Sequence, residues 1–159
     1  MSMVSKAYFR DKRSPTPKSD VVSRVMSANK AKDTAPEIAL RKAFWSQGAR
    51  GYRLHKRVEG TRPDIVFTKQ KIAIFVHGCY WHRCPDCKLP LPKNNISFWK
   101  QKFERNKQRD KEKTHKLKKA GWKVLVVWEC QVTKDSTKLP DQILTGGKIL
   151  LNTKSVNML

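Results

Sequence analysis

The chain has 159 residues with 35 Lys and Arg against 13 Asp and Glu, a formal net charge of +22, and a pI near 10.2. This length fits one domain, and the charge excess favours a polyanionic partner such as nucleic acid, although charge alone does not separate an enzyme from a basic coat protein. We find neither an apolar run near the roughly 20 residues of a membrane helix nor a secretory signal, so we expect an intracellular protein.

The first predicted helix follows a basic N-terminal segment. Residues 1–30 are polar and contain two prolines, and we expect them to form a flexible arm. The sequence TAPE at 34–37 has the pattern of a capping box, in which Thr34 bonds the amide of Glu37 and the Glu37 carboxylate reaches back. It predicts a helix that ends before Gly48.

The next segments predict three short strands. Residues 52–55 have the composition of a strand, and 64–67 and 71–76 are β-branched runs separated by three polar residues. Two such runs most simply form a β-hairpin. A cysteine-rich loop over 77–95 follows the hairpin.

The second half of the chain predicts one long helix and one buried strand. Ser97 is a candidate N-cap for a helix over 98–120, and Gly121 is its expected C-terminal stop. The continuous apolar run KVLVVW at 123–128 is typical of a buried strand. Together the elements predict a small α/β domain with a mixed sheet, over 31–134, and a tail of weak pattern over 135–159.

All four cysteines have metal-ligand spacing. Cys79, Cys84 and Cys87 are separated by four and two residues, and Cys130 follows the last predicted strand. Four thiolates complete the tetrahedral coordination of Zn²⁺ and leave no open position, which is typical of a structural site. The alternative is a set of buried or redox-active thiols, but the use of every cysteine in a recognised ligand count favours zinc.

Asp64 stands in RPDIVF, directly before a predicted strand. Many nucleases hold a divalent ion with a carboxylate at the start of a strand, and Mg²⁺ needs only one or two carboxylates besides phosphate and water. A solvated aspartate in a Pro-Asp turn is the alternative, and on the pattern alone it is the more frequent case.

Two histidines and three aromatic residues accompany the cysteines. His77 and His82 each have the chemistry of a general base near neutral pH, with a hydrogen-bonding role around zinc as the alternative. Tyr80, Trp81 and Trp99 suit stacking on bases or wedging between them, with core packing as the alternative. Because a metal-clamped loop is poorly placed to bury three rings, we expect these rings to be exposed.

The long helix carries an acid on its inward stripe. Phe103, Asp110 and Leu117 are seven residues apart, so Asp110 faces the body of the protein. A buried carboxylate is costly without a positive partner, which is either an ordinary Lys or Arg, or a catalytic histidine or hydrated metal. The outer faces of this helix are rich in Lys and Arg and suit contact with phosphates.

Taken together, these segments resemble the very-short-patch mismatch repair endonucleases, the Vsr family. The matching segments run in order over about residues 22–132 and are KDTAPEIALR, RPDIVF, IFVHGCYWHRCPDC, FW at 98–99 and GWKVLVVWEC. The resemblance implies a restriction-endonuclease-like α/β fold, with a mixed sheet flanked by helices and a structural zinc site. It also implies Mg²⁺-dependent nicking of one strand of duplex DNA, 5′ to the T of a T·G mismatch left by 5-methylcytosine deamination.

The resemblance further implies roles for individual residues. Asp64 corresponds to the aspartate that holds Mg²⁺, and Val76, where a familiar member has Thr, corresponds to the donor of a backbone carbonyl to that metal. His82 corresponds to the catalytic histidine. The supporting active-site positions are His77, Glu37 and Asp110; the aromatic wedge is Tyr80, Trp81 and Trp99; the Zn²⁺ ligands are Cys79, Cys84, Cys87 and Cys130.

The implied partner is double-stranded DNA with a T·G mismatch, joined by repair proteins and a cognate cytosine-5 methyltransferase system, with no membrane. We expect a monomer in the bacterial cytoplasm, associated with the nucleoid, whose basic arm lies along the minor groove. Two alternatives stay open: a related restriction-type or nicking endonuclease that acts on matched DNA, and a zinc-stapled DNA-binding module without catalysis.

Overall fold

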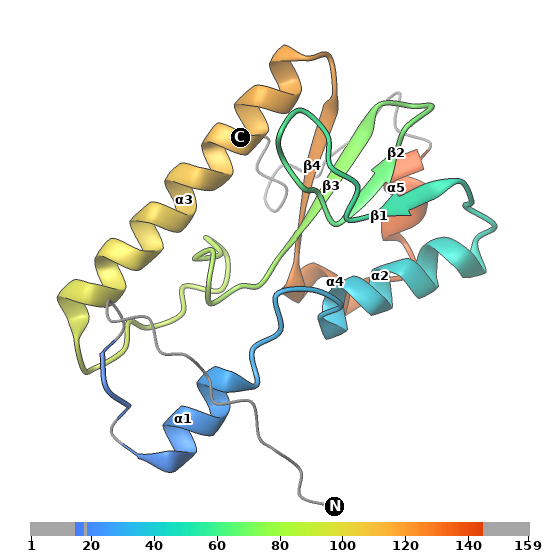
Figure 1. The fold of residues 1–159 in the computed structure, drawn as a ribbon. Coiled ribbons are helices and arrows are strands. Elements are labelled where there is room, and N and C mark those ends of the chain that lie inside the picture. Colours follow the sequence, from blue (N-terminus) through green and yellow to red (C-terminus); the bar gives the residue numbers. More distant parts are fainter. Residues whose placement is uncertain (1–14, 18, 145–159) are drawn as a thin grey trace, which may run out of the picture.

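A four-stranded mixed sheet forms the centre of the computed structural model, which describes residues 15–17 and 19–144. Its strands lie in the order β1 (Tyr52–Leu54), β2 (Ile65–Phe67), β3 (Ile72–His77) and β4 (Lys123–Trp128). The first two pairings are antiparallel, and β3 and β4 are parallel (Figure 1). The predicted hairpin, the final buried strand and the mixed sheet are therefore confirmed.

Five helices accompany the sheet within the described residues. They are α1 (Asp20–Ser27), α2 (Ala35–Ser46), α3 (Ile96–Lys119), α4 (Glu129–Asp135) and α5 (Leu139–Leu144). The two predicted helices, α2 and α3, are confirmed. None of the helices between residues 15 and 144 is long and apolar enough to cross a membrane.

Helices also form in two segments for which no helix was predicted. Helix α1 lies within the expected arm over 1–30 and has no buried residue, so the flexibility of this arm stays a prediction. Helices α4 and α5 lie at the start of the C-terminal segment of weak pattern, and each is too short to repeat a helical period. The parts of both predictions that fall on 1–14, 18 and 145–159 lie outside the described residues.

The N-terminal caps of α2 and α3 differ from those predicted. The Thr34 hydroxyl donates to Oε1 of Glu37 at 2.8 Å, and Oε2 of Glu37 accepts from the amide of Asp33 at 3.1 Å. The reciprocal capping box is therefore wrong in detail, because the Glu37 side chain takes both donors itself. The long helix begins at Ile96, after a left-handed Asn95, so Ser97 is not its cap.

Side chains alternate between the two faces of the sheet, and both faces are buried because helices pack on each of them. Leu40 and Phe44 of α2 pack on one face with Phe67, and each is almost completely buried. On the other face Leu117 of α3 packs with Phe75. Each fully buried side chain of this size contributes about 1.5–3 kcal/mol of transfer free energy. Helix α3 thus covers one face while α2, α4 and α5 lie on the other (Figure 1), which confirms a mixed sheet flanked by helices.

Strand pairing brings three strand ends to one edge of the sheet. In the parallel register His77 pairs with Trp128, so the residues after each strand leave the sheet side by side. Strand β2 runs antiparallel to β3, and the amide of Asp64, just before β2, donates to the carbonyl of Ile74 at 2.9 Å. The start of β2 therefore lies beside the ends of β3 and β4.

Candidate active site

A cleft of about 1580 Å³ opens where β2 begins and β3 ends. The structure brings every residue predicted for catalysis, Mg²⁺ or DNA contact to the lining of this one cleft. These residues are Glu37, Asp64, Val76, His77, Tyr80, Trp81, His82, Trp99 and Asp110. They come from α2, β2, β3, the following loop and α3, and their convergence depends on the sheet register rather than on sequence proximity.

Asp64 lies at the floor of this arrangement with a side chain that is 19% exposed. Its Oδ2 accepts the backbone N–H of Val76 at 2.7 Å. Burial raises the pKa of Asp64 to about 6, and the nearby charge of Glu37 acts in the same direction. An ionised carboxylate in this position would be stabilised by a cation, which is the behaviour expected of a metal ligand.

His82 and Asp110 form a close hydrogen-bonded pair in the cleft. The Nδ1 atom of His82 is 2.5 Å from Oδ2 of Asp110. Burial of Asp110 opposes ionisation, but its hydrogen bond with His82 and the surrounding positive charge lower its pKa overall. Since an ionised carboxylate only accepts hydrogen bonds, Nδ1 of His82 is the donor, and the lone pair remains on Nε2. The predicted inward orientation of Asp110 is confirmed, and its partner is the histidine rather than only a surface cation.

His77 stacks on His82 with ring centroids 4.0 Å apart and an angle of 11° between the planes. Burial lowers the pKa of His77 to about 3, and the adjacent His82 contributes in the same direction. His77 is therefore neutral near physiological pH. A neutral neighbour allows His82 to accept a proton without the repulsion that a second imidazolium would cause.

Glu37 belongs to a polar cluster that the sequence did not reveal in full. Its carboxylate is 4% exposed and pairs with Arg41 at 3.0 Å, while Arg41 also pairs with Asp33 at 2.5 Å. His55 lies against the same group, with Nε2 at 3.1 Å from Nη2 of Arg41. The spacing of four residues between Glu37 and Arg41 was a usable signal, whereas the placement of His55 depends on the β1–β2 pairing.

Lys113 and Glu129 are among the charged residues that line the cleft and were not predicted. Lys113 lies one turn beyond Asp110 on α3, and its Nζ is 3.7 Å from Oδ1 of that aspartate. Glu129 follows β4, and its Oε2 accepts the backbone N–H of Cys79 at 3.0 Å. The i,i+3 spacing of Lys113 and Asp110 was visible in the sequence, but the role of Glu129 depends on the parallel register of β3 and β4.

The aromatic residues form a packed group rather than three exposed rings. Tyr80 and Trp81 are half-buried and meet edge to face with centroids 5.1 Å apart. Trp99 is only 9% exposed, so the prediction of an exposed ring is wrong there, because Trp99 packs between Trp81 and Phe103 at 6.1 and 5.9 Å. The ammonium of Lys102 lies over the rings of Trp81 and Trp99 at 5.3 and 5.0 Å, so the group presents positive charge at the cleft.

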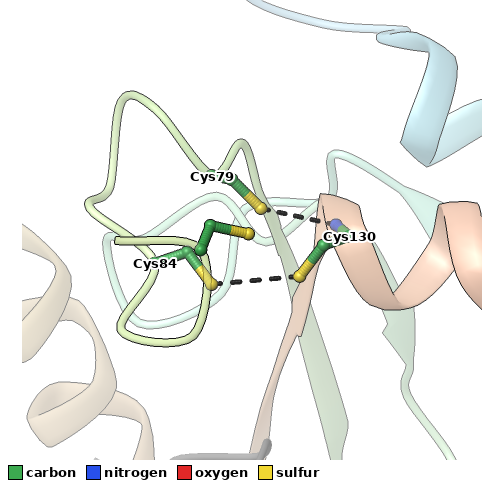
Figure 2. Close-up of side chains that lie close together, drawn as sticks. Cys79, Cys84 and Cys130 are labelled. Carbon is green, nitrogen blue, oxygen red and sulfur yellow. Dashed lines mark hydrogen bonds between the residues drawn. The ribbon is translucent and has the colours of Figure 1, made fainter. Parts of the chain in front are cut away.

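The four cysteines meet at the sheet edge next to the cleft. One Sγ atom from each of Cys79, Cys84, Cys87 and Cys130 lies within 4.8 Å of the others. The sulfur atoms of Cys84 and Cys130 are 3.9 Å apart, and Sγ of Cys79 accepts the amide of Cys130 at 3.4 Å. Figure 2 shows these two contacts between the loop and the start of α4. Tetrahedral Zn²⁺ with Zn–S bonds of about 2.3 Å requires sulfur–sulfur distances of about 3.8 Å. The donor set and its spacing therefore fit a closed four-thiolate metal site.

The chain is similar to one family of known proteins. The profile of the family described as "DNA mismatch endonuclease Vsr" matches residues 16–89. Type II nicking enzyme V.NaeI of Lentzea aerocolonigenes is 42% identical over 127 residues, which cover 77% of this chain and 75% of that protein. Type II nicking enzyme V.NmeAIP of Neisseria meningitidis is 42% identical over 110 residues, covering 69% and 78%.

Two other proteins match this chain over 93% of their own length. DNA mismatch endonuclease Vsr of Escherichia coli K12 is 31% identical over 147 residues, which cover 86% of this chain and 93% of that protein. Among solved structures, the catalytic domain of homing endonuclease I-Bth0305I matches with a TM-score of 0.48 and 24% identity, over 71% of this chain and 93% of that one. The identities to relatives covered over most of their length establish that this chain belongs to the Vsr family of DNA endonucleases.

Proposed function

We propose that this endonuclease nicks one strand of duplex DNA 5′ to the T of a T·G mismatch, using Mg²⁺, and that residues 31–134 form the nuclease domain. The observation that carries the proposal is the His82–Asp110 pair in the same cleft as Asp64. A protein that only binds DNA gains nothing from buried acids facing phosphate, so this constellation argues against the non-catalytic module. The T·G specificity rests on the family and on the relative from E. coli.

Asp64 and the backbone carbonyl of Val76 are the residues we assign to Mg²⁺. The buried, uncompensated carboxylate of Asp64 supports this assignment, and a Val side chain is compatible with a role played by the main chain alone. When bound, the divalent ion supplies positive charge at the scissile phosphate. Glu37, buried close enough to influence Asp64, adds negative charge that favours cation binding.

His82 is assigned as the general base that removes a proton from the attacking water. Its Nδ1–H is held by Asp110, which orients the ring and leaves Nε2 as the acceptor. The Asp110 carboxylate also stabilises the imidazolium that forms when His82 takes the proton. Neutral His77, stacked on the same ring, fixes the plane of His82 without adding charge.

Tyr80, Trp81 and Trp99 are assigned to DNA opening. Tyr80 and Trp81 line the cleft, and Lys102 beside them offers positive charge to the phosphates. Inserting rings between base steps costs a few kcal/mol of unstacking, and this cost is lowest at a mismatched pair. Because Trp99 is buried, we assign it to supporting the ring of Trp81 from below.

The four cysteines are assigned to structural Zn²⁺. Tyr80, Trp81 and His82 lie between Cys79 and Cys84 in the sequence. A metal that joins these two cysteines to Cys130 therefore fixes this short segment to the end of β4. Four thiolates leave no position for substrate, and the zinc therefore takes no part in the chemistry.

A second candidate function is nicking of a matched site associated with a restriction system. It is favoured by the two relatives at 42% identity, whose names describe Type II nicking enzymes. Mismatch repair beside a cytosine-5 methyltransferase and nicking within a restriction system use the same cleft chemistry. The two functions differ only in the substrate.

The deciding experiment is a nicking assay with Mg²⁺ on end-labelled duplexes that are identical except for a T·G or a matched pair, in several cytosine-methylation contexts. Nicking 5′ to the mismatched T, lost in Asp64→Ala, supports the mismatch function. Nicking of matched duplexes in place of mismatched ones supports the second candidate. Binding without cleavage in every context contradicts both.

A further inference from the structure

His55 occupies a strained position directly after β1. Its φ angle is +50°, in the left-handed region that favours glycine and, among other residues, asparagine. Its N–H donates to the backbone carbonyl of Asp64 at 3.1 Å, and its own carbonyl accepts from Nε of Arg62 at 3.1 Å. The turn therefore fixes the backbone of His55 directly against that of Asp64.

The imidazole of His55 is 15% exposed and lies among three carboxylate groups, with Nε2 at 3.7 Å from Oδ1 of Asp33 and at 3.7 Å from Oε2 of Glu37. Its Nε2 is 3.1 Å from Nη2 of Arg41. Because a guanidinium only donates hydrogen bonds, Nε2 must present its lone pair, and the ring proton is on Nδ1. Nδ1 is 3.8 Å from Oδ1 of Asp64.

Arg41 is itself immobilised, so the orientation of the ring is determined. It pairs with Asp33 and Glu37 at 2.5 and 3.0 Å, and its side chain is 14% exposed. A continuous polar connection thus runs from α2 through Arg41 and His55 to Asp64. It ends at Nδ1 of His55, which lies 3.8 Å from Oδ1 of the Asp64 carboxylate.

We propose that His55 is a positioning residue that sets the rotation of the Asp64 carboxylate for metal binding. Oδ2 of Asp64 is taken by the Val76 amide, and Oδ1 faces Nδ1 of His55 at a distance longer than a hydrogen bond. The N–H dipole of His55 therefore restrains Oδ1 without occupying its lone pairs, which remain available to a cation. This inference rests on the proposed role of Asp64 and identifies a residue that would control it.

The left-handed backbone of His55 allows the role of its imidazole to be tested with residues that tolerate this conformation. A non-glycine residue there costs on the order of 1 kcal/mol, so His55→Gly relieves strain while it removes the imidazole. His55→Asn keeps a residue that tolerates this conformation and places an amide nitrogen on Cγ, where histidine has Nδ1. A purely structural role predicts that both variants bind Mn²⁺ like the wild type, whatever their Tm.

The experiment measures Mn²⁺ affinity of the full chain, with its zinc retained and no Mg²⁺ added, by electron paramagnetic resonance, together with Tm and the Mg²⁺ dependence of nicking. We expect His55→Gly to weaken Mn²⁺ binding about 10-fold or more, as the loss of an orienting partner does at other metal sites. Half-maximal nicking should need correspondingly more Mg²⁺. His55→Asn should restore most of the affinity. His115→Asn, at an exposed histidine on α3, controls for loss of an imidazole elsewhere.

The failure of this inference is distinct from the failure of the proposed function. If Asp64→Asn keeps wild-type Mn²⁺ affinity, the metal assignment of Asp64 is wrong, and the role of His55 falls with it. If Asp64→Asn abolishes binding while His55→Gly binds like the wild type, only the role of His55 is overturned. Equal loss of affinity in His55→Gly and His55→Asn also overturns it, because the retained N–H would then have no effect.

Discussion

The Nδ1 atom of His82 lies 2.5 Å from Oδ2 of Asp110, although 28 residues separate them in the chain. The aspartate comes from the middle of α3 and the histidine from the loop after β3. Their contact links the helix to the loop and also determines which nitrogen of the imidazole is free to take a proton. The attachment of the loop to α3 and the availability of Nε2 of His82 therefore depend on the same hydrogen bond.

Replacing Asp110 with asparagine should slow the chemical step while leaving DNA binding intact. The Asn amide can donate to Nδ1, which would move the ring proton to Nε2 and remove the base. General-base catalysis contributes about 10²–10⁴-fold, and a loss of that size is expected in single-turnover nicking. Fluorescence anisotropy with the same duplex in Ca²⁺ should report an unchanged Kd. A wild-type rate in Asp110→Asn would exclude the assigned role of His82.

Nicking should decline as the pH is lowered through about 6. Burial and the charge of Glu37 raise the pKa of Asp64 to about 6, and protons compete with Mg²⁺ for its carboxylate. A higher Mg²⁺ concentration should therefore move the acidic midpoint to lower pH. His77 does not contribute to this limb, because its pKa is lowered to about 3. A midpoint that does not move between 1 and 20 mM Mg²⁺, concentrations on the order of those used for such enzymes, would contradict the competition.

Asp64→Asn should stabilise the Mg²⁺-free protein at alkaline pH. The pKa of Asp64 is about 6 in the folded protein against 3.8 for an ordinary aspartate, so ionisation costs stability as the pH rises through that interval. Above it the folded protein carries the full penalty, and a neutral isostere removes it. Calorimetry of the zinc-loaded protein without added Mg²⁺ should give a higher Tm for the variant at pH 8 and a small difference at pH 4. A lower Tm at pH 8 would show that the charge is compensated in the free protein.

Cys130→Ser should release the metal and lower the Tm of the whole domain. Cys130 is contributed by α4 and the other three ligands by the loop after β3, so one substitution disconnects the two. Binding of structural zinc is coupled to folding, with apparent free energies of about 10 kcal/mol in small domains. Atomic absorption should give about one zinc per wild-type chain and a substoichiometric value in the variant. Asp110→Asn is the control, because its zinc content should match the wild type.

Lys113 and Lys107 form a matched pair for testing charge at the cleft. Both are on α3, both side chains are 44% exposed, and both pair with an acid three residues earlier. Only Lys113 lines the cleft and contacts Asp110. Lys113→Gln should lower the single-turnover rate about 10-fold or more, within the range for removal of one charge-stabilising group. Lys107→Gln should alter only the salt dependence of DNA binding. Equal effects on the rate would assign both lysines to general electrostatic attraction.

The sheet was predictable because its strands have local sequence patterns that are typical of β-structure. The run KVLVVW is apolar on both faces, as a central strand covered by helices must be, and the two β-branched segments before it pair as the intervening turn suggests. The inward position of Asp110 followed from the spacing of Phe103 and Leu117 on α3. Local periodicity was enough in each of these cases.

The parts that the sequence did not predict depend on long-range contacts. Trp99 was expected to be exposed, but its burial depends on Trp81, which the loop after β3 brings to α3. His55 and Arg41 meet only because β1 pairs with β2 beside the start of α2. Such contacts carry no periodic signature in the chain.

The parallel pairing of β3 with β4 has a consequence for how the protein is made. Residues as far apart in the sequence as Glu37 and Glu129 line the cleft. Because α3 separates β3 from β4 in the chain, β4 can pair with β3 only after the whole of α3 has been synthesised. A growing chain on the ribosome holds Asp64 and His82 long before it holds β4, and contacts of this sequence separation form late. We therefore expect ribosome-bound fragments that end before β4 to lack nicking activity, so that a highly basic nuclease does not cut DNA until its synthesis has passed residue 130.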